Sequence, residues 1–129
     1  MRSNIHVINF ILLANAVVQV SRAMDSSIPF INADDVHLQG IDGSGVTVAV
    51  IDTGIDYWHH GLLGDIAPGG ASFENRIMQQ DPGMDIYGYG HGTYMSLNIT
   101  DAIGVAPYTN ILPIRVFRND GYAYDEDIE

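Results

Sequence analysis

The chain has 129 residues, of which 47% are hydrophobic, so it is long enough to form one domain with a core of its own. The chain has sixteen acidic residues, five arginines and no lysine. Its formal net charge of −11 excludes the basic surface that nucleic-acid binding needs. Cysteine is absent, which excludes both a disulfide framework and a thiolate metal site.

Residues 1–23 have the composition of a targeting segment. Arg2 near the start is followed by a mainly apolar stretch over Val7–Val20 and then by Ser21-Arg22-Ala23. This order is typical of a secretory signal peptide with small residues before the cleavage point. The apolar stretch is too short and too polar for a membrane span. We therefore expect a secreted, extracellular protein whose mature part begins near residue 24.

Residues 24–40 form an arm that leads into the domain, with one helical turn expected at Ala33–Leu38. Gly40, Gly43 and Gly45 then mark a turn. Their spacing is close to a dinucleotide-binding fingerprint, but that fingerprint needs a strand before the glycines and a helix after them. Here the strand follows the glycines, so we do not expect nucleotide binding.

The segment Val46–Asp56 is the most informative part of the chain. It begins as a run of Val, Ile and Ala that is polar only at Thr47, and it then reaches Asp52 and Gly54. Such a run predicts a strand that is buried on both faces of a parallel sheet. Because ligands bind beyond the carboxyl ends of strands in open α/β sheets, we expect Asp52 at the functional edge.

The next segments are loops with a short strand. Tyr57–Gly70 carries His59 and His60, whose adjacent side chains rarely face one metal ion together in regular structure. We therefore expect exposed or hydrogen-bonded histidines at these positions and no metal site. An apolar patch at Arg76–Met78 predicts a short strand within a loop that is otherwise rich in Gly and Pro.

A second chemical signal lies at Gly90-His91-Gly92-Thr93, followed by residues that can form a helix to about Thr100. Histidine titrates near neutral pH, and a buried carboxylate can fix its tautomer and stabilise the imidazolium. Asp52 and His91 together therefore suggest a base and the group that orients it. A further apolar strand is expected at Ile111–Phe117, although Pro113 removes one donor from its ladder.

Three blocks of the sequence resemble, in this order, the subtilisin-like serine proteases: Val48–Asp56, His91-Gly92-Thr93, and Gly104-Val105-Ala106-Pro107 with Ile111–Phe117. The resemblance extends over about residues 31–129 and implies that residues 24–129 are the N-terminal part of that family's peptidase domain. It implies an α/β fold of three layers, with a mainly parallel sheet flanked by helices. It also implies serine endopeptidase activity on polypeptides, with Asp52 as catalytic aspartate and His91 as general base.

The nucleophile that the resemblance implies is missing from this sequence. In the family it lies in a Gly-Thr-Ser-Met-Ala type segment far downstream, and none of the seven serines here has such a context. Ser44 comes nearest, but Gly43-Ser44-Gly45 precedes a strand, whereas a nucleophile turn follows one. We therefore expect a protease fragment that is inactive as it stands and that leaves apolar faces uncovered. The alternative is a protease-like domain that has lost its nucleophile and binds peptides.

Two further interpretations of these residues stay open. Asp52-Thr53-Gly54 after apolar residues also resembles the active-site loop of small dimeric aspartic proteases, in which two carboxylates share one proton. The His-Gly-Thr block has no role in that scheme. Because the subtilisin-like family commonly has an N-terminal propeptide, residues 1–23 are alternatively the tail of such a propeptide.

The resemblance further suggests where substrate contacts and packing differences lie. In the family, the segment after the second strand lines the channel that pairs with an extended peptide, which suggests Gly121 and Tyr122 as substrate-binding residues. Leu97 stands where the family usually has a small residue. If a neighbouring helix must pack closely there, we expect Leu97 to overfill the contact at a cost of about 1 to 3 kcal/mol unless its neighbours repack.

No cofactor is required for the chemistry that the resemblance implies, but the resemblance also suggests structural calcium. Family members often hold calcium through loop carboxylates, and Gly61 occupies one usual ligand position without offering a side-chain oxygen. Asp65, Asp81 and Asp85 are the remaining candidate donors, since calcium takes six to eight oxygen ligands from flexible loops.

Overall fold

The computed structural model describes residues 27–79, 83–85 and 90–128. The chain divides into two compact units, Met1–Gln39 and Gly40–Glu129. The expected signal peptide, or propeptide tail, lies outside the described residues. Of the helices in the described part, none combines the length and the apolar character that crossing a membrane requires.

The described part of the first unit holds two short helices, α2 over Ser27–Phe30 and α3 over Ala33–His37. Asn32 lies between them in the left-handed region with a φ of 57°. Asparagine tolerates this conformation better than most residues, so the chain can turn there. The helix α3 confirms the helical turn that the sequence predicts at Ala33–Leu38.

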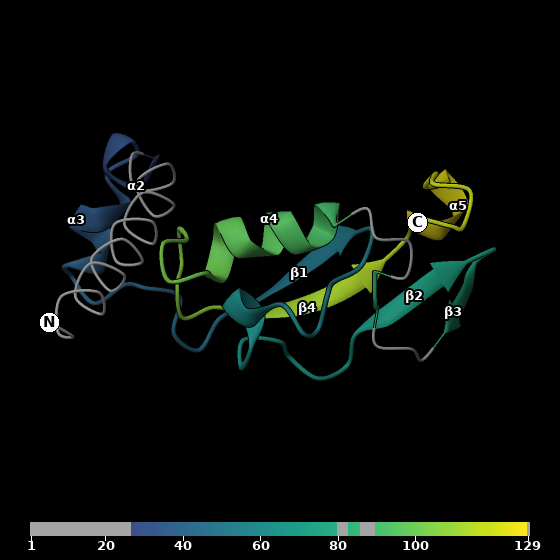
Figure 1. Ribbon diagram of the computed structural model, residues 1–129, viewed down its shortest axis with the longest axis horizontal. Coiled ribbons are helices and arrows are strands. Elements are labelled where there is room, and N and C mark those ends of the chain that lie inside the picture. The colour runs from purple at the N-terminus through teal and green to yellow at the C-terminus, as the bar shows by residue number, and fades with distance from the viewer. Residues whose placement is uncertain (1–26, 80–82, 86–89, 129) are drawn as a thin grey trace, which may run out of the picture. The chain divides into compact units, whose positions relative to one another are not determined.

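The second unit is built on a four-stranded sheet in the order β1-β4-β2-β3 (Figure 1). Its strands are β1 (Thr47–Asp52), β2 (Ala71–Glu74), β3 (Ile77–Gln79) and β4 (Asn110–Arg115). The strand β4 pairs in parallel with both β1 and β2, and β3 runs antiparallel to β2. All three strands expected from the sequence are confirmed, with ends displaced by about two residues at most.

Three helical segments complete this unit: the 3-10 turn η1 (His60–Leu62), α4 (His91–Thr100) and α5 (Asp125–Ile128). The helix α4 lies along the sheet in Figure 1 and contacts both β1 and β4. A mainly parallel sheet with helices confirms the expected α/β class. It also confirms the helix predicted to begin at His91 and to run to Thr100.

The core of this unit lies between α4 and the sheet. Its buried cluster consists of Ile55, Leu62 and Ile111. Side chains of β1 and α4 pack against this cluster, namely Val48, Val50, Leu97 and Ile99. Because burial of one such side chain stabilises a fold by about 1.5 to 3 kcal/mol, this interface fixes α4 on the sheet.

Leu97 fits this core because Gly61 leaves room for it. A Cβ atom at Gly61 would come within 2.8 Å of Leu97 Cδ2, which is closer than ordinary packing allows. Leu97 therefore meets a residue without a side chain, and the cost expected for an overfilled contact stays a prediction. The larger residue on α4 is compensated by the absence of a side chain on η1.

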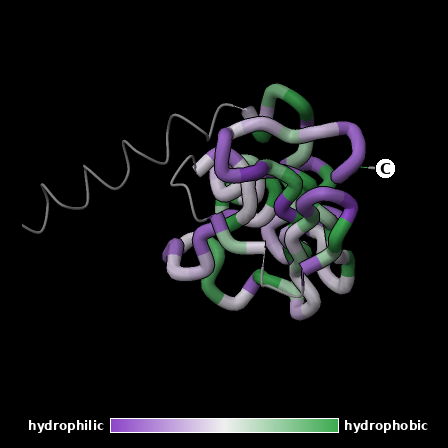
Figure 2. Tube along the Cα trace, turned by 90° about the vertical axis from the view of Figure 1, so that its right-hand side faces the viewer, coloured by the Kyte–Doolittle hydropathy of each residue, from purple (hydrophilic) through white to green (hydrophobic). Residues whose placement is uncertain are grey.

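The opposite face of β1 is open, which corrects the expectation of a strand buried on both faces. Exposure alternates along β1, and Ile51 on the open face is 56% exposed. A groove of about 500 Å³ runs over this face, and its apolar lining residues are Ile51, Phe73, Ile114, Val116 and Ile128. In Figure 2 the backbone trace is coloured by hydropathy, and hydrophobic stretches alternate with hydrophilic ones along it. The cause is that, among the described residues, packed side chains cover only the α4 side of β1.

A charged cluster around Arg118 holds α5 against the turn between β2 and β3. The Arg118 guanidinium donates to Asp127 and Glu126, and its Cζ atom lies 4.2 Å from the centroid of the Tyr124 ring. The buried Asp127 carboxylate also accepts a hydrogen bond of 3.1 Å from Arg76 N. Bonds to Asp127 and then Glu126 raise the pKa of Arg118, and the bond from Arg118 lowers the pKa of Asp127.

We predict that acid loosens this cluster. Since the pKa of Asp127 in the folded state lies below its ordinary value of 3.8, the unfolded chain binds more protons, and stability falls as the pH drops through the folded pKa. Asp127→Asn should flatten the pH dependence of the unfolding free energy below about pH 4. Urea unfolding of the full-length protein at a series of pH values measures this, with Asp125→Asn on the same helix as the control. Equal slopes for Asp127→Asn and the wild type would contradict the prediction.

Candidate active site

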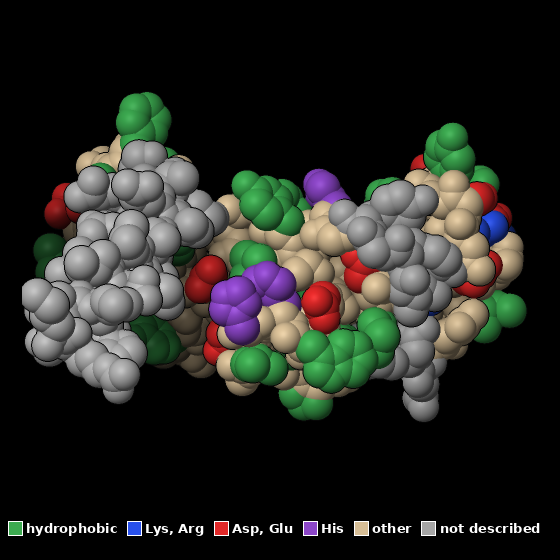
Figure 3. Space-filling view, in the orientation of Figure 1, with side chains coloured by type: hydrophobic (Ala, Val, Ile, Leu, Met, Phe, Trp, Pro, Cys, Tyr) green, Lys and Arg blue, Asp and Glu red, His purple; other side chains and the backbone are tan. Residues whose placement is uncertain are grey.

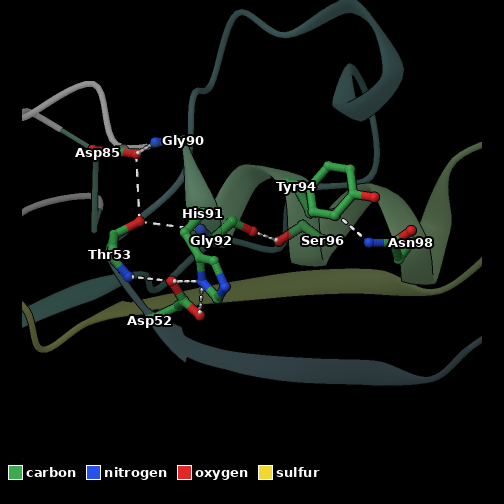
Figure 4. Close-up of polar contacts among 9 residues, drawn as sticks. All are labelled: Asp52, Thr53, Asp85, Gly90, His91, Gly92, Tyr94, Ser96 and Asn98. Atoms are coloured by element: carbon green, nitrogen blue, oxygen red, sulfur yellow. Dashed lines mark hydrogen bonds and ion pairs between the residues drawn. The ribbon is translucent and has the colours of Figure 1, made fainter.

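Asp52 and His91 come together at the carboxyl edge of the sheet (Figure 4). Asp52 is the last residue of β1, and His91 is the first residue of α4. The His91 Nδ1 atom lies 2.8 Å from Asp52 Oδ1 and 2.9 Å from Asp52 Oδ2. The contact expected between this carboxylate and this imidazole is therefore present.

The two partners differ in how far solvent reaches them. The Asp52 side chain is 14% exposed, whereas that of His91 is 59% exposed. Thr53 N donates to Asp52 Oδ1 over 2.7 Å, and Val116 N donates to the main-chain carbonyl of Asp52 over 3.0 Å. The carboxylate is thus held by its own turn and the main chain of Asp52 by the segment after β4, while the imidazole stays accessible to an incoming group.

The bonding of the His91 ring determines what it can do chemically. An ionised carboxylate only accepts hydrogen bonds, so the proton between the two groups belongs to His91 Nδ1. The lone pair of the neutral ring then lies on Nε2. Across the described ranges, the ring makes its hydrogen bonds through Nδ1. The arrangement can therefore accept a proton at Nε2 while Asp52 stabilises the resulting imidazolium.

Two glycines allow the turn after β1 to meet the start of α4. Gly54 has a φ of 99°, and a Cβ atom there would lie 2.7 Å from Asp85 N and 2.7 Å from Gly83 O. A Cβ atom on Gly92 would overlap the Gly54 carbonyl and would lie 3.1 Å from Asp52 Cβ. The geometry of the pair therefore depends on the absence of side chains at these two positions.

Thr53 and Asp85 connect the turn after β1 to the start of α4 (Figure 4). Asp85 Oδ2 accepts hydrogen bonds from Gly90 N at 2.6 Å and from Thr53 Oγ1 at 3.4 Å. Thr53 Oγ1 in turn accepts from Gly92 N at 3.0 Å. The sequence suggests Asp85 only as a calcium donor, and it contains no local signal for Thr53, because these contacts join segments that are far apart in the chain.

The serines of this unit bond to groups other than His91. Ser44 Oγ donates to an acid of its own turn, as expected for turn chemistry. Ser72 is buried and accepts from Arg115 Nε, and Ser96 is buried and donates to the main chain of its own helix. Among the described residues, no serine hydroxyl is hydrogen-bonded to the His91 ring.

His59 and His60 stack on each other with their ring centroids 4.7 Å apart. Two histidine side chains lie together on the face shown in Figure 3, with acidic side chains nearby. His59 Nδ1 accepts a hydrogen bond of 3.3 Å from Gly61 N, and His60 is exposed. Both positions therefore match the expected exposed or hydrogen-bonded histidines.

The candidate calcium donors do not form a cage in the part of the chain that the structure describes. Asp81 lies outside the described residues. Within the described ranges, no group of three or more His, Asp or Glu side chains is placed to hold a metal ion, so Asp65 and Asp85 belong to no such group. The Asp85 carboxylate is instead bonded at the start of α4.

Gly121 and Tyr122 lie in a turn that follows β4. Gly121 N donates to Arg118 O over 3.0 Å, and Arg118 N donates to Tyr122 O over 2.9 Å. Because Asp52 pairs with Arg115 at the ends of β1 and β4, this turn follows the same edge of the sheet as the Asp52 carboxylate. Tyr122 is 67% exposed, and its contact with substrate stays a prediction.

We predict that Gly92→Ala separates Asp52 from His91. The added methyl group would overlap the Gly54 carbonyl, so the start of α4 must shift, at a cost of about 1 to 3 kcal/mol. Proton NMR should show the loss of the low-field signal of the hydrogen-bonded Nδ1 proton. Tyr94→Ala, at an exposed position of the same helix, should keep that signal. An unchanged signal in Gly92→Ala would show that this close approach is not required.

Sequence comparison relates this chain to known proteins. The model of the family described as Peptidase_S8, Subtilase family, matches residues 43–129. The chain is 38% identical over 100 residues to subtilisin DY of Bacillus licheniformis, and this aligned region covers 73% of the chain and 34% of that protein. It is 37% identical over 111 residues to a thermostable alkaline protease of Halalkalibacterium halodurans, and this aligned region covers 83% of the chain and 29% of that protein.

A third relative is the minor extracellular protease Vpr of Bacillus subtilis, which is 32% identical over 117 residues that cover 84% of the chain and 14% of that protein. The chain therefore spans about a third or less of the length of these relatives. The family match covers more than half of the chain and contains both Asp52 and His91. From this match and these identities we conclude that the chain belongs to the subtilase family.

Proposed function

We propose that this chain forms the N-terminal part of the catalytic domain of a serine endopeptidase. In this proposal Asp52 orients His91, and His91 is the general base. The observation that carries it is the hydrogen bond between His91 Nδ1 and Asp52 at 2.8 Å, at the carboxyl edge of a mainly parallel sheet. Membership of the subtilase family supports the same assignment.

The proposed chemistry is acyl transfer from a peptide bond. His91 Nε2 takes the proton of a serine hydroxyl as its oxygen attacks the peptide carbonyl, and the imidazolium that forms is stabilised by Asp52. His91 then gives the proton to the leaving amine. The exposed His91 ring and the shielded Asp52 carboxylate suit these roles, since the base must reach the substrate and its partner must keep the ring in one orientation.

We further propose that the nucleophilic serine belongs to a segment outside these 129 residues. Ser44, Ser72 and Ser96 support this because each is bonded away from His91. The greater length of the relatives also supports it. The open groove beside Ile51 and Ile114 is then a surface that such a segment would cover, because apolar sheet faces need a second layer.

The contact between His91 and Asp52 also bears on the two competing functions. A dimeric aspartic protease would bring Asp52 against a second carboxylate. In this structure the Asp52 carboxylate is bonded to the His91 imidazole instead, so the geometry does not favour that scheme. A peptide-binding domain without a nucleophile would keep the same pair. Turnover by the full-length protein would indicate a protease, because a peptide-binding domain without a nucleophile has none.

The remaining parts of the proposal concern substrate, location and cofactors. We infer an extended polypeptide substrate that contacts Gly121 and Tyr122 beyond β4. Secretion is supported by the apolar segment before residue 24 and by the name of the extracellular relative Vpr. The chemistry needs no cofactor, and any calcium would serve stability alone, so a chelator should change the melting temperature before it changes the chemical step.

The first test uses the full-length protein and an unstructured protein substrate. Asp52→Asn should lower kcat by about 10⁴-fold because it leaves the base in the wrong tautomer, and His91→Ala by about 10⁶-fold because it removes the base. His60→Ala changes another exposed histidine and should keep wild-type kcat. Wild-type turnover by His91→Ala would refute the assignment, and absence of turnover in the wild type would favour a peptide-binding domain.

The second test uses residues 24–129 alone. We expect no turnover, strong binding of a hydrophobic dye and a broad thermal transition, because the groove around Ile51 is uncovered. Ile51→Thr should reduce dye binding, whereas Ile111→Thr in the buried cluster should unfold the piece. Turnover that Asp52→Ala abolishes, or a sharp cooperative transition, would contradict the proposed fragment.

A further inference from the structure

We propose that Asp85 is a positioning residue for the catalytic pair: its carboxylate, acting through Thr53 and the first amides of α4, holds the His91 ring against Asp52. The inference rests on the proposed function only for its catalytic meaning. Its structural content, which is control of the contact between His91 and Asp52, can be measured without any turnover.

The start of α4 lacks the side chain that usually caps a helix. Its N-cap residue is Gly90, with a φ of 66° and no side-chain cap. The first amides of a helix have no partner within the helix and need acceptors from elsewhere. Asp85 Oδ2 accepts from Gly90 N at 2.6 Å, and Thr53 Oγ1 accepts from Gly92 N at 3.0 Å. Residues on both sides of His91 are therefore fixed by groups from other segments.

The two acceptors are linked to each other. Thr53 is 5% exposed, and its hydroxyl donates to Asp85 Oδ2 at 3.4 Å while it accepts from Gly92 N. Donation to a carboxylate polarises the hydroxyl and strengthens it as an acceptor. The Asp85 charge also lies at the positive end of the α4 dipole, where it is favourable. Loss of Asp85 would thus weaken both contacts at once.

Asp85 is held in register with the segment that carries Asp52. Ile55 N donates to Gly83 O at 3.0 Å, and Asp85 N donates to Ile55 O at 3.0 Å. These bonds dock residues 83–85 onto the turn that follows β1. One continuous set of bonds therefore runs from the Asp52 turn to Asp85, from Asp85 to the start of α4, and through His91 back to Asp52.

This closed set of contacts accounts for the orientation of the His91 ring. His91 Nδ1 reaches both oxygens of Asp52, at 2.8 and 2.9 Å, although the ring itself is largely exposed and has little packing around it. The backbone on either side of His91 must then supply the constraint. A displacement of a catalytic group by about 1 Å can cost about 100-fold in rate, so the constraint matters for catalysis.

The experiment compares Asp85→Ala, Asp85→Asn and Thr53→Val in the full-length protein labelled with ¹⁵N-histidine. NMR reports the His91 tautomer and the low-field proton on Nδ1. Asp85→Ala and Thr53→Val should weaken that proton signal and mix the two tautomers. Asp85→Asn keeps an acceptor oxygen and should keep the wild-type spectrum. In the active enzyme, kcat should fall between about 10- and 100-fold for the first two variants, with KM little changed.

Asp56→Ala is the matched control, because Asp56 lines the same 410 Å³ cavity as Asp85 but its carboxylate accepts from Trp58 N. It removes an equal charge and should leave the His91 spectrum unchanged. The proposal is overturned if Asp85→Ala keeps the wild-type spectrum, or if Asp56→Ala changes it equally. If Asp85→Ala does not fold, Thr53→Val decides in the same way. A His91 signal that depends on Asp85 in a protein without turnover would refute the proposed function and leave this inference standing.

Discussion

The hydrogen bond between His91 and Asp52 is the contact on which the proposed site depends, and it joins residues 39 positions apart. Parallel pairing of β1 with β4 places Asp52 opposite Arg115 at the carboxyl ends of both strands. The helix α4 begins at that edge with His91. Strand register alone would not bring the groups together, because the approach also needs bare backbone at Gly54 and Gly92.

Much of this arrangement could be predicted because each half of the contact has a local signal. The Val- and Ile-rich run before Asp52 indicates a strand, and the residues after His91 form the helix that they favour. The bonds of Asp85 and Thr53 have no such signal, since they replace a cap that Gly90 cannot supply. The exposure of Ile51 could not be predicted from the sequence either, because an isoleucine is found there whether or not another layer covers the strand.

The two faces of the sheet have different degrees of completeness. The α4 face contains the buried cluster of Ile55, Leu62 and Ile111, and the helix bearing His91 packs on this face. The other face carries an open apolar groove beside the Arg118 cluster. The helix that bears His91 packs on the covered face, so the contact between His91 and Asp52 forms among the residues of this unit.

The packing of Leu97 against Gly61 has a consequence for how this loop can diverge. A carboxylate at position 61 would collide with the leucine, and it would also approach Asp101, whose Oδ2 would lie only 3.4 Å from a Cβ atom at that position. A leucine on the helix and an acid at position 61 therefore compete for the same space, and the Leu97 side chain would have to turn aside to admit the acid. An engineer who wished to install an oxygen ligand here would have to consider residue 97 in the same step.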